Sequence, residues 1–115
     1  MTGGDLTVVC ERRHDAILVI LTGHLDLATV SQLETGFPSP RPGETALVNL
    51  DALSFIDSKG IRAFMQLDLT ARAEGWSLVL VGAQGHVSHT LRLCHVHDRI
   101  RMIEAEQSTA SDPAT

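Results

Sequence analysis

Aromatic side chains are scarce in this chain of 115 residues, which has three phenylalanines, one tryptophan and no tyrosine. A hydrophobic core must therefore consist mainly of Leu, Val, Ile and Ala. The length predicts one domain with a core of modest size. The hydrophobic fraction of 43% and the charged fraction of 20% are ordinary for a globular domain.

Long apolar runs and clusters of basic residues are also missing. The longest apolar run, Ala16 to Leu21, is far too short to span a bilayer, so we expect no membrane association. The net charge is −5 with neutral histidines. Because no run of Lys or Arg forms a basic stripe, we expect no nucleic-acid partner.

Cysteine is nearly absent. Cys10 and Cys94 stand far apart, and the N-terminal stretch has no basic region followed by an apolar segment of the kind that marks a signal peptide. Two separate cysteines without an export signal are typical of reduced thiols. We therefore expect a cytoplasmic protein.

Five short stretches have strand character, and the first two are separated by a polar turn at His14-Asp15. This arrangement predicts an edge hairpin. The dense apolar run of the second stretch predicts a strand that is covered on both faces. The predicted strands are residues 5–13, 16–23, 46–50, 77–82 and 100–103.

Three segments have helical spacing. In the first, Leu27, Val30 and Leu33 share one helical face, and Asp26 is placed to cap the helix N-terminus. This helix must end near Thr35-Gly36, because three prolines follow. The other two predicted helices span residues 58–74, with Gly75 as the C-cap residue, and residues 85–94.

The resulting order of elements is β β α β α β α β. Such an order predicts an α/β domain with a mixed sheet of four to five strands and helices packed mainly on one face. The stretch from 105 to 115 has no apolar periodicity, and we expect a disordered tail there.

An unusual polar cluster, Asp57-Ser58-Lys59-Gly60, stands where a strand ends and a helix begins. Asp57 or Ser58 could simply cap the helix. A helix N-terminus also attracts anions, because its first N–H groups lack partners inside the helix. Gly60 is costly inside a helix unless something must approach the backbone closely.

The stretch "LVNLDALSFIDSKGIRAFM" closely resembles the signature of the STAS domain family, in particular its anti-sigma factor antagonists. The stretches "LVILTGHLDLAT" and "AEGWSLVLVGAQGHVSHTLRL" resemble two further family segments. The resemblance covers roughly residues 5 to 103 and implies a single STAS-like domain at 1–104.

The resemblance also implies a function that is not enzymatic and needs no cofactor. In such antagonists the serine of the Asp-Ser motif is phosphorylated by an anti-sigma factor that is itself a serine kinase using ATP. The unphosphorylated antagonist binds the anti-sigma factor and so frees a sigma factor for transcription. By position, Ser58 is the implied phosphoacceptor. The implied partner-binding residues are Asp26, Asp57, Ser58, Lys59 and Gly60.

Lys59 departs from the family pattern, which usually has a small hydroxyl residue at this position. A lysine in the first helical turn opposes the helix dipole slightly. It could pair with a phosphate or an acidic partner, or it could be solvated. The helix that usually ends the family's fold is not visible in "EAEQSTASDPAT".

Three other interpretations compete with this one. Four histidines, His86, His89, His95 and His97, cluster with Cys94 and could hold zinc, but they lack a known ligand spacing. We therefore predict no metal site. Hydrolysis by Ser58 would need a base, for which His24 is the candidate, but no Gly-x-Ser-x-Gly motif is present. A STAS scaffold, or an accessory subunit of a lipid-transport or stress-signalling complex, would keep the fold without a phosphorylation switch.

Overall fold

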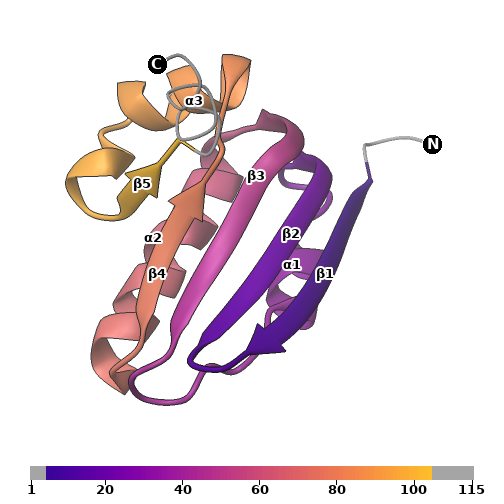
Figure 1. Ribbon diagram of the computed structural model, residues 1–115. Coiled ribbons are helices and arrows are strands. Elements are labelled where there is room, and N and C mark those ends of the chain that lie inside the picture. The colour runs from indigo at the N-terminus through magenta and orange to yellow at the C-terminus, as the bar shows by residue number, and fades with distance from the viewer. Residues whose placement is uncertain (1–4, 105–115) are drawn as a thin grey trace, which may run out of the picture.

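The computed structural model describes residues 5–104 (Figure 1). The disordered tail predicted at residues 105–115 lies outside the described part of the chain.

Within residues 5–104, five strands form one mixed sheet in the order β1-β2-β3-β4-β5 (Figure 1). β1 and β2 pair antiparallel, and each later strand is parallel to its neighbour. This confirms the predicted edge hairpin and the predicted fold class. The strands are β1 (Leu6–Arg13), β2 (Ala16–Leu25), β3 (Thr45–Ile56), β4 (Ser77–Val81) and β5 (Arg101–Ile103).

The helices in the described part of the chain are α1 (Val30–Gly36), α2 (Ser58–Glu74) and α3 (Gly85–Leu93), and a short 3-10 helix, η1 (Val96–Asp98), follows α3. α1 and α2 lie behind the sheet in Figure 1, so they cover one of its faces. Gly75 ends α2 in the left-handed conformation, as predicted. Within residues 5–104, none of the helices combines the length and apolarity that crossing a membrane requires.

β2 shows that the sheet is covered unequally. Ile17, Val19 and Leu21 are almost completely buried, whereas Leu18 and Ile20 between them are only half-buried. The prediction that this strand is covered on both faces was therefore wrong. The helices pack on one face, and alternate side chains of β2 point to the other.

The core lies between the sheet and the helices. Phe64 of α2 is fully buried, and Val87 and Leu91 of α3 are buried as well. Removing a side chain as large as Phe64 from water contributes about 1.5–3 kcal/mol to folding. Hydrophobic packing thus fixes α2, and with it the position of its first residue, Ser58.

Two boundaries differ most from the sequence prediction. The first helix begins at Val30, and Leu27 lies before it with 68% of its surface exposed. Asp26 was therefore wrongly predicted as the helix cap, because the N-cap residue is Thr29. β3 continues to Ile56 instead of ending at Leu50, because its second half pairs with the end of β2 across two register shifts.

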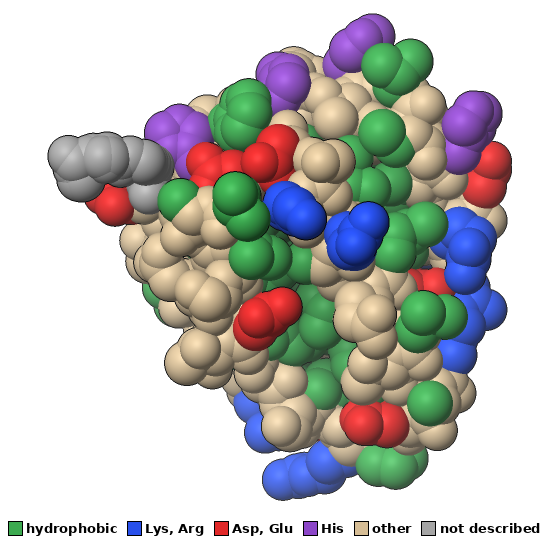
Figure 2. Space-filling model, turned by 180° about the vertical axis from the view of Figure 1, so that it is seen from behind, with side chains coloured by type: hydrophobic (Ala, Val, Ile, Leu, Met, Phe, Trp, Pro, Cys, Tyr) green, Lys and Arg blue, Asp and Glu red, His purple; other side chains and the backbone are tan. Residues whose placement is uncertain are grey.

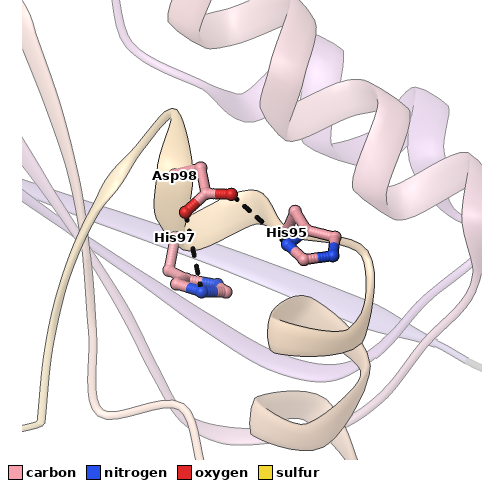
Figure 3. Close-up of side chains that lie close together, drawn as sticks. All are labelled: His95, His97 and Asp98. Carbon is pink, nitrogen blue, oxygen red and sulfur yellow. Dashed lines mark ion pairs between the residues drawn. The ribbon is translucent and has the colours of Figure 1, made fainter.

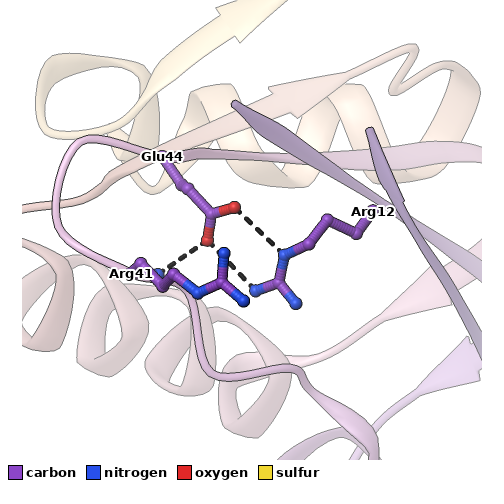
Figure 4. Close-up of polar contacts among 3 residues, drawn as sticks. All are labelled: Arg12, Arg41 and Glu44. Atoms are coloured by element: carbon purple, nitrogen blue, oxygen red, sulfur yellow. Dashed lines mark hydrogen bonds and ion pairs between the residues drawn. The ribbon is translucent and has the colours of Figure 1, made fainter. Parts of the chain in front are cut away.

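Where β3 begins, at the end of the sheet opposite Ser58, a charged cluster connects the edge strand β1 to the loop before β3 (Figure 4). Arg12 donates two hydrogen bonds to the Glu44 carboxylate, at 3.0 and 3.1 Å. The backbone N–H of Arg41 donates a third at 2.7 Å. These donors lower the pKa of the Glu44 carboxyl to about 2, with the Arg12 hydrogen bond as the largest cause.

Candidate functional site

The strand-to-helix loops that follow β2 and β3 meet at one edge of the sheet. The two strands are parallel neighbours, so their carboxyl ends lie side by side, with Leu25 opposite Ile56. The backbone N–H of Asp57 donates to the carbonyl of Leu25 at 3.2 Å. The loop after Leu25 and the loop after Ile56 therefore form one surface.

Asp57 organises this surface through both oxygens of its carboxylate. Oδ1 accepts hydrogen bonds from the backbone N–H groups of Lys59 at 2.9 Å and Gly60 at 3.1 Å, which makes Asp57 the N-cap of α2. Oδ2 accepts from the backbone N–H of Leu27 at 3.2 Å. One side chain thus caps the helix and holds the neighbouring loop.

Ser58 is the first residue of α2, and its side chain is exposed. The sequence left open whether Asp57 or Ser58 caps the helix. Because Asp57 fills that role, the Ser58 hydroxyl is not needed for capping, and among residues 5–104 it makes no hydrogen bond to another side chain or to the backbone. Lys59 beside it is exposed too. The structure therefore presents a free hydroxyl at a helix N-terminus.

Gly60 is buried and lies two residues after Ser58, in the first turn of the helix. A Cβ atom there would lie 2.7 Å from the Ile56 side chain and 2.8 Å from both the side chain and the carbonyl oxygen of Leu25. Gly60 therefore permits a close contact of α2 with the ends of β2 and β3 of the same chain. Because Gly60 has no side chain, the start of α2 can pack directly against the ends of β2 and β3 under this surface.

Asp26 stabilises the loop between β2 and α1 through hydrogen bonds inside that loop. Its Oδ1 atom accepts hydrogen bonds from the backbone N–H groups of Ala28 at 3.0 Å and Thr29 at 3.2 Å. The buried Thr29 hydroxyl in turn donates to the carbonyl of His24 at 2.8 Å. Asp26 is half-buried and lies in the loop that Asp57 holds, so the structure brings the two acids into adjoining loops.

An aromatic group at the same edge of the sheet was missed by the sequence analysis. Phe55 has 38% of its surface exposed, and its ring stacks on the His86 ring at 5.0 Å with an interplanar angle of 8°. The ring of His24 also meets Phe55, edge-on, with the ring centroids 6.1 Å apart. A strict two-residue alternation across Ser54, Phe55 and Ile56 would have predicted an outward-facing Phe55.

His86 links α3 to the end of β3, directly before Asp57. Its Nε2 atom lies 3.2 Å from the carbonyl oxygen of Ile56, the residue before Asp57. Nearby, Gln84 donates to the backbone carbonyl of Asp51 at 3.0 Å. The start of α3 therefore packs on the part of β3 that extends past β4, and it braces the chain just before Ser58.

Charges of both signs are interspersed on the helix-covered side of the molecule (Figure 2). Lys and Arg side chains near the middle of this view stand close to Asp and Glu side chains, and histidines lie around its upper margin. Apolar side chains are visible between them. This face therefore offers a mixed polar and apolar surface.

The histidine and cysteine cluster considered for zinc does not assemble as a whole. Within residues 5–104, the donor atoms that converge belong to His95, His97 and Asp98, without His86, His89 or Cys94. His24, the base considered for hydrolysis, contacts Phe55, and among the described residues no hydrogen bond joins it to Ser58. In this arrangement His24 is not placed to act as a general base for Ser58.

A family model described as "Mlab, STAS domain" matches residues 9–104. The chain belongs to the STAS domain family. The match spans the sheet from the second half of β1 to the end of β5 and includes the whole surface around Ser58. No curated protein shows a significant sequence match to the chain.

Solved structures with the same fold include two bacterial regulators. An anti-sigma factor antagonist from Mycobacterium paratuberculosis is 17% identical, with a TM-score of 0.70 and coverage of 92% of each chain. The Bacillus cell fate determinant SpoIIAA in its phosphorylated form is 21% identical, with a TM-score of 0.56 and coverage of 95% of this STAS domain and 100% of that chain.

The fold also occurs inside a much larger protein. The murine anion transporter Solute Carrier 26 family member A9 matches with 18% identity and a TM-score of 0.68. The match covers 80% of this STAS domain but only 16% of the transporter chain. At these identities, the similarities to solved structures show a shared fold.

Proposed function

We propose that this STAS domain is an anti-sigma factor antagonist whose binding to an anti-sigma factor is switched off by phosphorylation of Ser58. The observation that carries the proposal is the free, exposed Ser58 hydroxyl at the start of α2, next to a cap that Asp57 already provides. The solved anti-sigma factor antagonist and the phosphorylated SpoIIAA, both with the same fold, support this class of function. The partner would be a serine kinase that supplies phosphate from its bound ATP.

A phosphate on Ser58 suits the free domain. It would add about −1.5 to −2 charges at neutral pH. The N-terminus of the 17-residue helix α2 favours negative charge, because its dipole presents its positive end there. The exposed Lys59 side chain is a further cation within reach along the chain.

The same phosphate would oppose a complex. In a close interface it would lose water, and it would lie near the carboxylates of Asp57 and Asp26 in the two joined loops. One covalent change could therefore lower affinity without unfolding the domain. In a cell this release would return the anti-sigma factor to its sigma factor, and we place the exchange in the cytoplasm.

The residues of this site would have different roles in such a switch. Ser58 accepts the phosphate and, with Lys59, contacts the partner. Asp57 and Asp26 hold the contact surface in shape and supply its negative charge. Gly60 acts indirectly, because its missing side chain lets α2 pack on Leu25 and Ile56.

The test combines labelling with binding. The purified chain is incubated with ATP and candidate serine-kinase anti-sigma factors, and mass spectrometry maps any phosphate. Isothermal titration then compares Ser58→Asp and Ser58→Ala, with Ser39→Asp in the distant proline-rich loop as a control for added charge. We expect Ser58→Asp to weaken binding about tenfold or more, which is about 1.4 kcal/mol, while Ser58→Ala and Ser39→Asp bind like the unmodified chain. Equal affinities of the two Ser58 variants would refute the switch.

A second candidate keeps the binding surface without the switch. The matching family model carries the name Mlab, and the same fold occurs in an anion transporter. In this case the chain would be a scaffold or accessory subunit of a lipid-transport or stress-signalling complex. Affinity purification from the source cells separates the two, because recovery of an ATPase transporter subunit instead of a kinase would favour the second.

A further inference from the structure

Two imidazoles and one carboxylate converge just after α3, in the segment that leads to β5 (Figure 3). The Nδ1 atom of His95 lies 3.3 Å from Oδ2 of Asp98, and the Nε2 atom of His97 lies 3.7 Å from Oδ1 of the same carboxylate. One donor atom from each of the three residues lies within 4.8 Å of the others. In Figure 3 the Asp98 carboxylate points toward both rings.

The backbone that carries these side chains is firmly held. Val96, which lies between the two histidines, and Ile100, two residues after Asp98, are fully buried in the core. The N–H of Asp98 donates to the carbonyl of His95 at 3.1 Å, and the N–H of Ile100 donates to the carbonyl of Val96 at 2.9 Å. The three donors therefore stand on the outside of an anchored turn, and little backbone order must be gained when they bind a ligand.

His95 has a conformation that brings its ring to the cluster. Its φ of +58° lies in the left-handed region, which is uncommon for residues other than glycine. In this turn the ring of His95 lies alongside the ring of His97, with their centroids 5.9 Å apart. The imidazoles thus lie together even though one residue separates them in the sequence.

We propose that His95, His97 and Asp98 bind one divalent cation of the zinc class. Zinc bonds of about 2.0–2.1 Å to nitrogen and oxygen place two ligands of a tetrahedral shell about 3.3 Å apart, close to the separations between the two imidazoles and the carboxylate. Imidazole suits zinc, nickel and copper, whereas magnesium and calcium prefer oxygen ligands. Water would complete the shell, because all three residues are exposed.

This site is independent of the proposed phosphorylation switch. Its ligands belong to the turn between α3 and β5 and include none of the residues assigned to the Ser58 surface. A bound ion would connect η1 to its own N-cap residue, since His95 is that N-cap and His97 and Asp98 are part of η1. The ion would then stabilise the path of the chain into the edge strand β5.

The experiment uses the full chain without an affinity tag, after treatment with EDTA and removal of the chelator. Isothermal titration with ZnCl₂ at mildly alkaline pH compares the unmodified chain with His95→Gln, His97→Gln and Asp98→Asn. His89→Gln is the matched control, because His89 is an exposed histidine of α3 outside the cluster. We expect one ion per chain, affinity unchanged by His89→Gln, and affinity lowered about tenfold or more by each of the other three substitutions.

Thermal unfolding gives a second readout. A cation that binds only the folded chain raises the melting temperature as its concentration increases. We expect ZnCl₂ to raise it for the unmodified chain and for His89→Gln, and to leave it nearly unchanged for His97→Gln. The proposal is overturned if no ion binds, if the cluster variants bind zinc as well as the unmodified chain, or if MgCl₂ binds as tightly as ZnCl₂.

Discussion

The backbone N–H of Leu27 donates a hydrogen bond to the Asp57 carboxylate, with N and Oδ2 3.2 Å apart, although 30 residues separate them in the sequence. The other oxygen of the same carboxylate caps α2 through Lys59 and Gly60. Any change at Asp57 therefore acts on the helix and on the neighbouring loop together. This relationship explains why an acid directly before Ser58 has structural as well as electrostatic consequences.

Asp57→Ala should lower the free energy of unfolding by about 0.5–2 kcal/mol, the usual effect of losing an N-cap side chain. Asp57→Asn should lower it less, because its amide oxygen can still accept from the helix N–H groups. Urea unfolding followed by circular dichroism measures both. Glu34→Ala, an exposed acid on α1, is the control and should change little. Full stability of Asp57→Ala would contradict the role of Asp57 as the cap.

Gly60→Ala should destabilise the domain by about 1–3 kcal/mol, the usual range for overpacking. The added Cβ would meet the carbonyl oxygen of Leu25 at 2.8 Å, and this backbone atom cannot move away without disturbing β2. Gly36→Ala should be milder, because there the nearest atom is a Val8 side-chain carbon at 3.1 Å. Urea titration of both variants is the measurement. A smaller loss for Gly60→Ala than for Gly36→Ala would show that α2 can shift away from β2.

The Glu44 cluster predicts a specific dependence of stability on pH. The folded-state pKa of Glu44 is lowered from an ordinary value of 4.5 to about 2, mainly by the Arg12 hydrogen bond. An acid with a lowered pKa stabilises the fold fully above its unfolded-state pKa, and it loses this contribution as the pH falls toward the folded-state value. We therefore expect Glu44→Gln to flatten the fall in stability between about pH 4.5 and pH 2.

Urea unfolding at a series of pH values tests this, with Glu34→Gln as the control. The control should follow the unmodified chain throughout the acid range, since Glu34 is exposed. If Glu44→Gln and the unmodified chain lose stability in parallel, the carboxylate of Glu44 is not the group that couples acid to unfolding.

Phe55→Ala should weaken the proposed partner complex while leaving the fold nearly intact. Its partly exposed ring stacks on His86 and meets His24 edge-on at the end of the sheet that carries Ser58, and exposed aromatic rings often dominate interface energies. We expect a loss of more than about 1 kcal/mol of binding free energy, roughly fivefold in affinity. Leu69→Ala removes a similarly exposed apolar side chain from the middle of α2 and should bind normally. Equal binding by both variants would place Phe55 outside the interface.

Much of the fold could be predicted from local patterns. The hairpin at His14-Asp15, the long amphipathic helix from Ser58 to Glu74 and its glycine C-cap all depend on residues close together in the chain. The first helix was predicted too early because Leu27 matches the spacing of Val30 and Leu33. Its exposure shows that spacing alone does not bury a residue.

The sequence by itself determined the order of elements, the strand-to-helix junction at Ser58 and the two residues able to cap it, because these follow from backbone preferences and short-range periodicity. Only the tertiary structure decided that Asp57 caps α2 and also binds the backbone of Leu27, that Gly60 faces Leu25, and that His86 lies against the carbonyl of Ile56. Those choices depend on parallel pairing of β2 with β3 and on the packing of α3. Contacts between segments tens of residues apart leave no local pattern in the sequence.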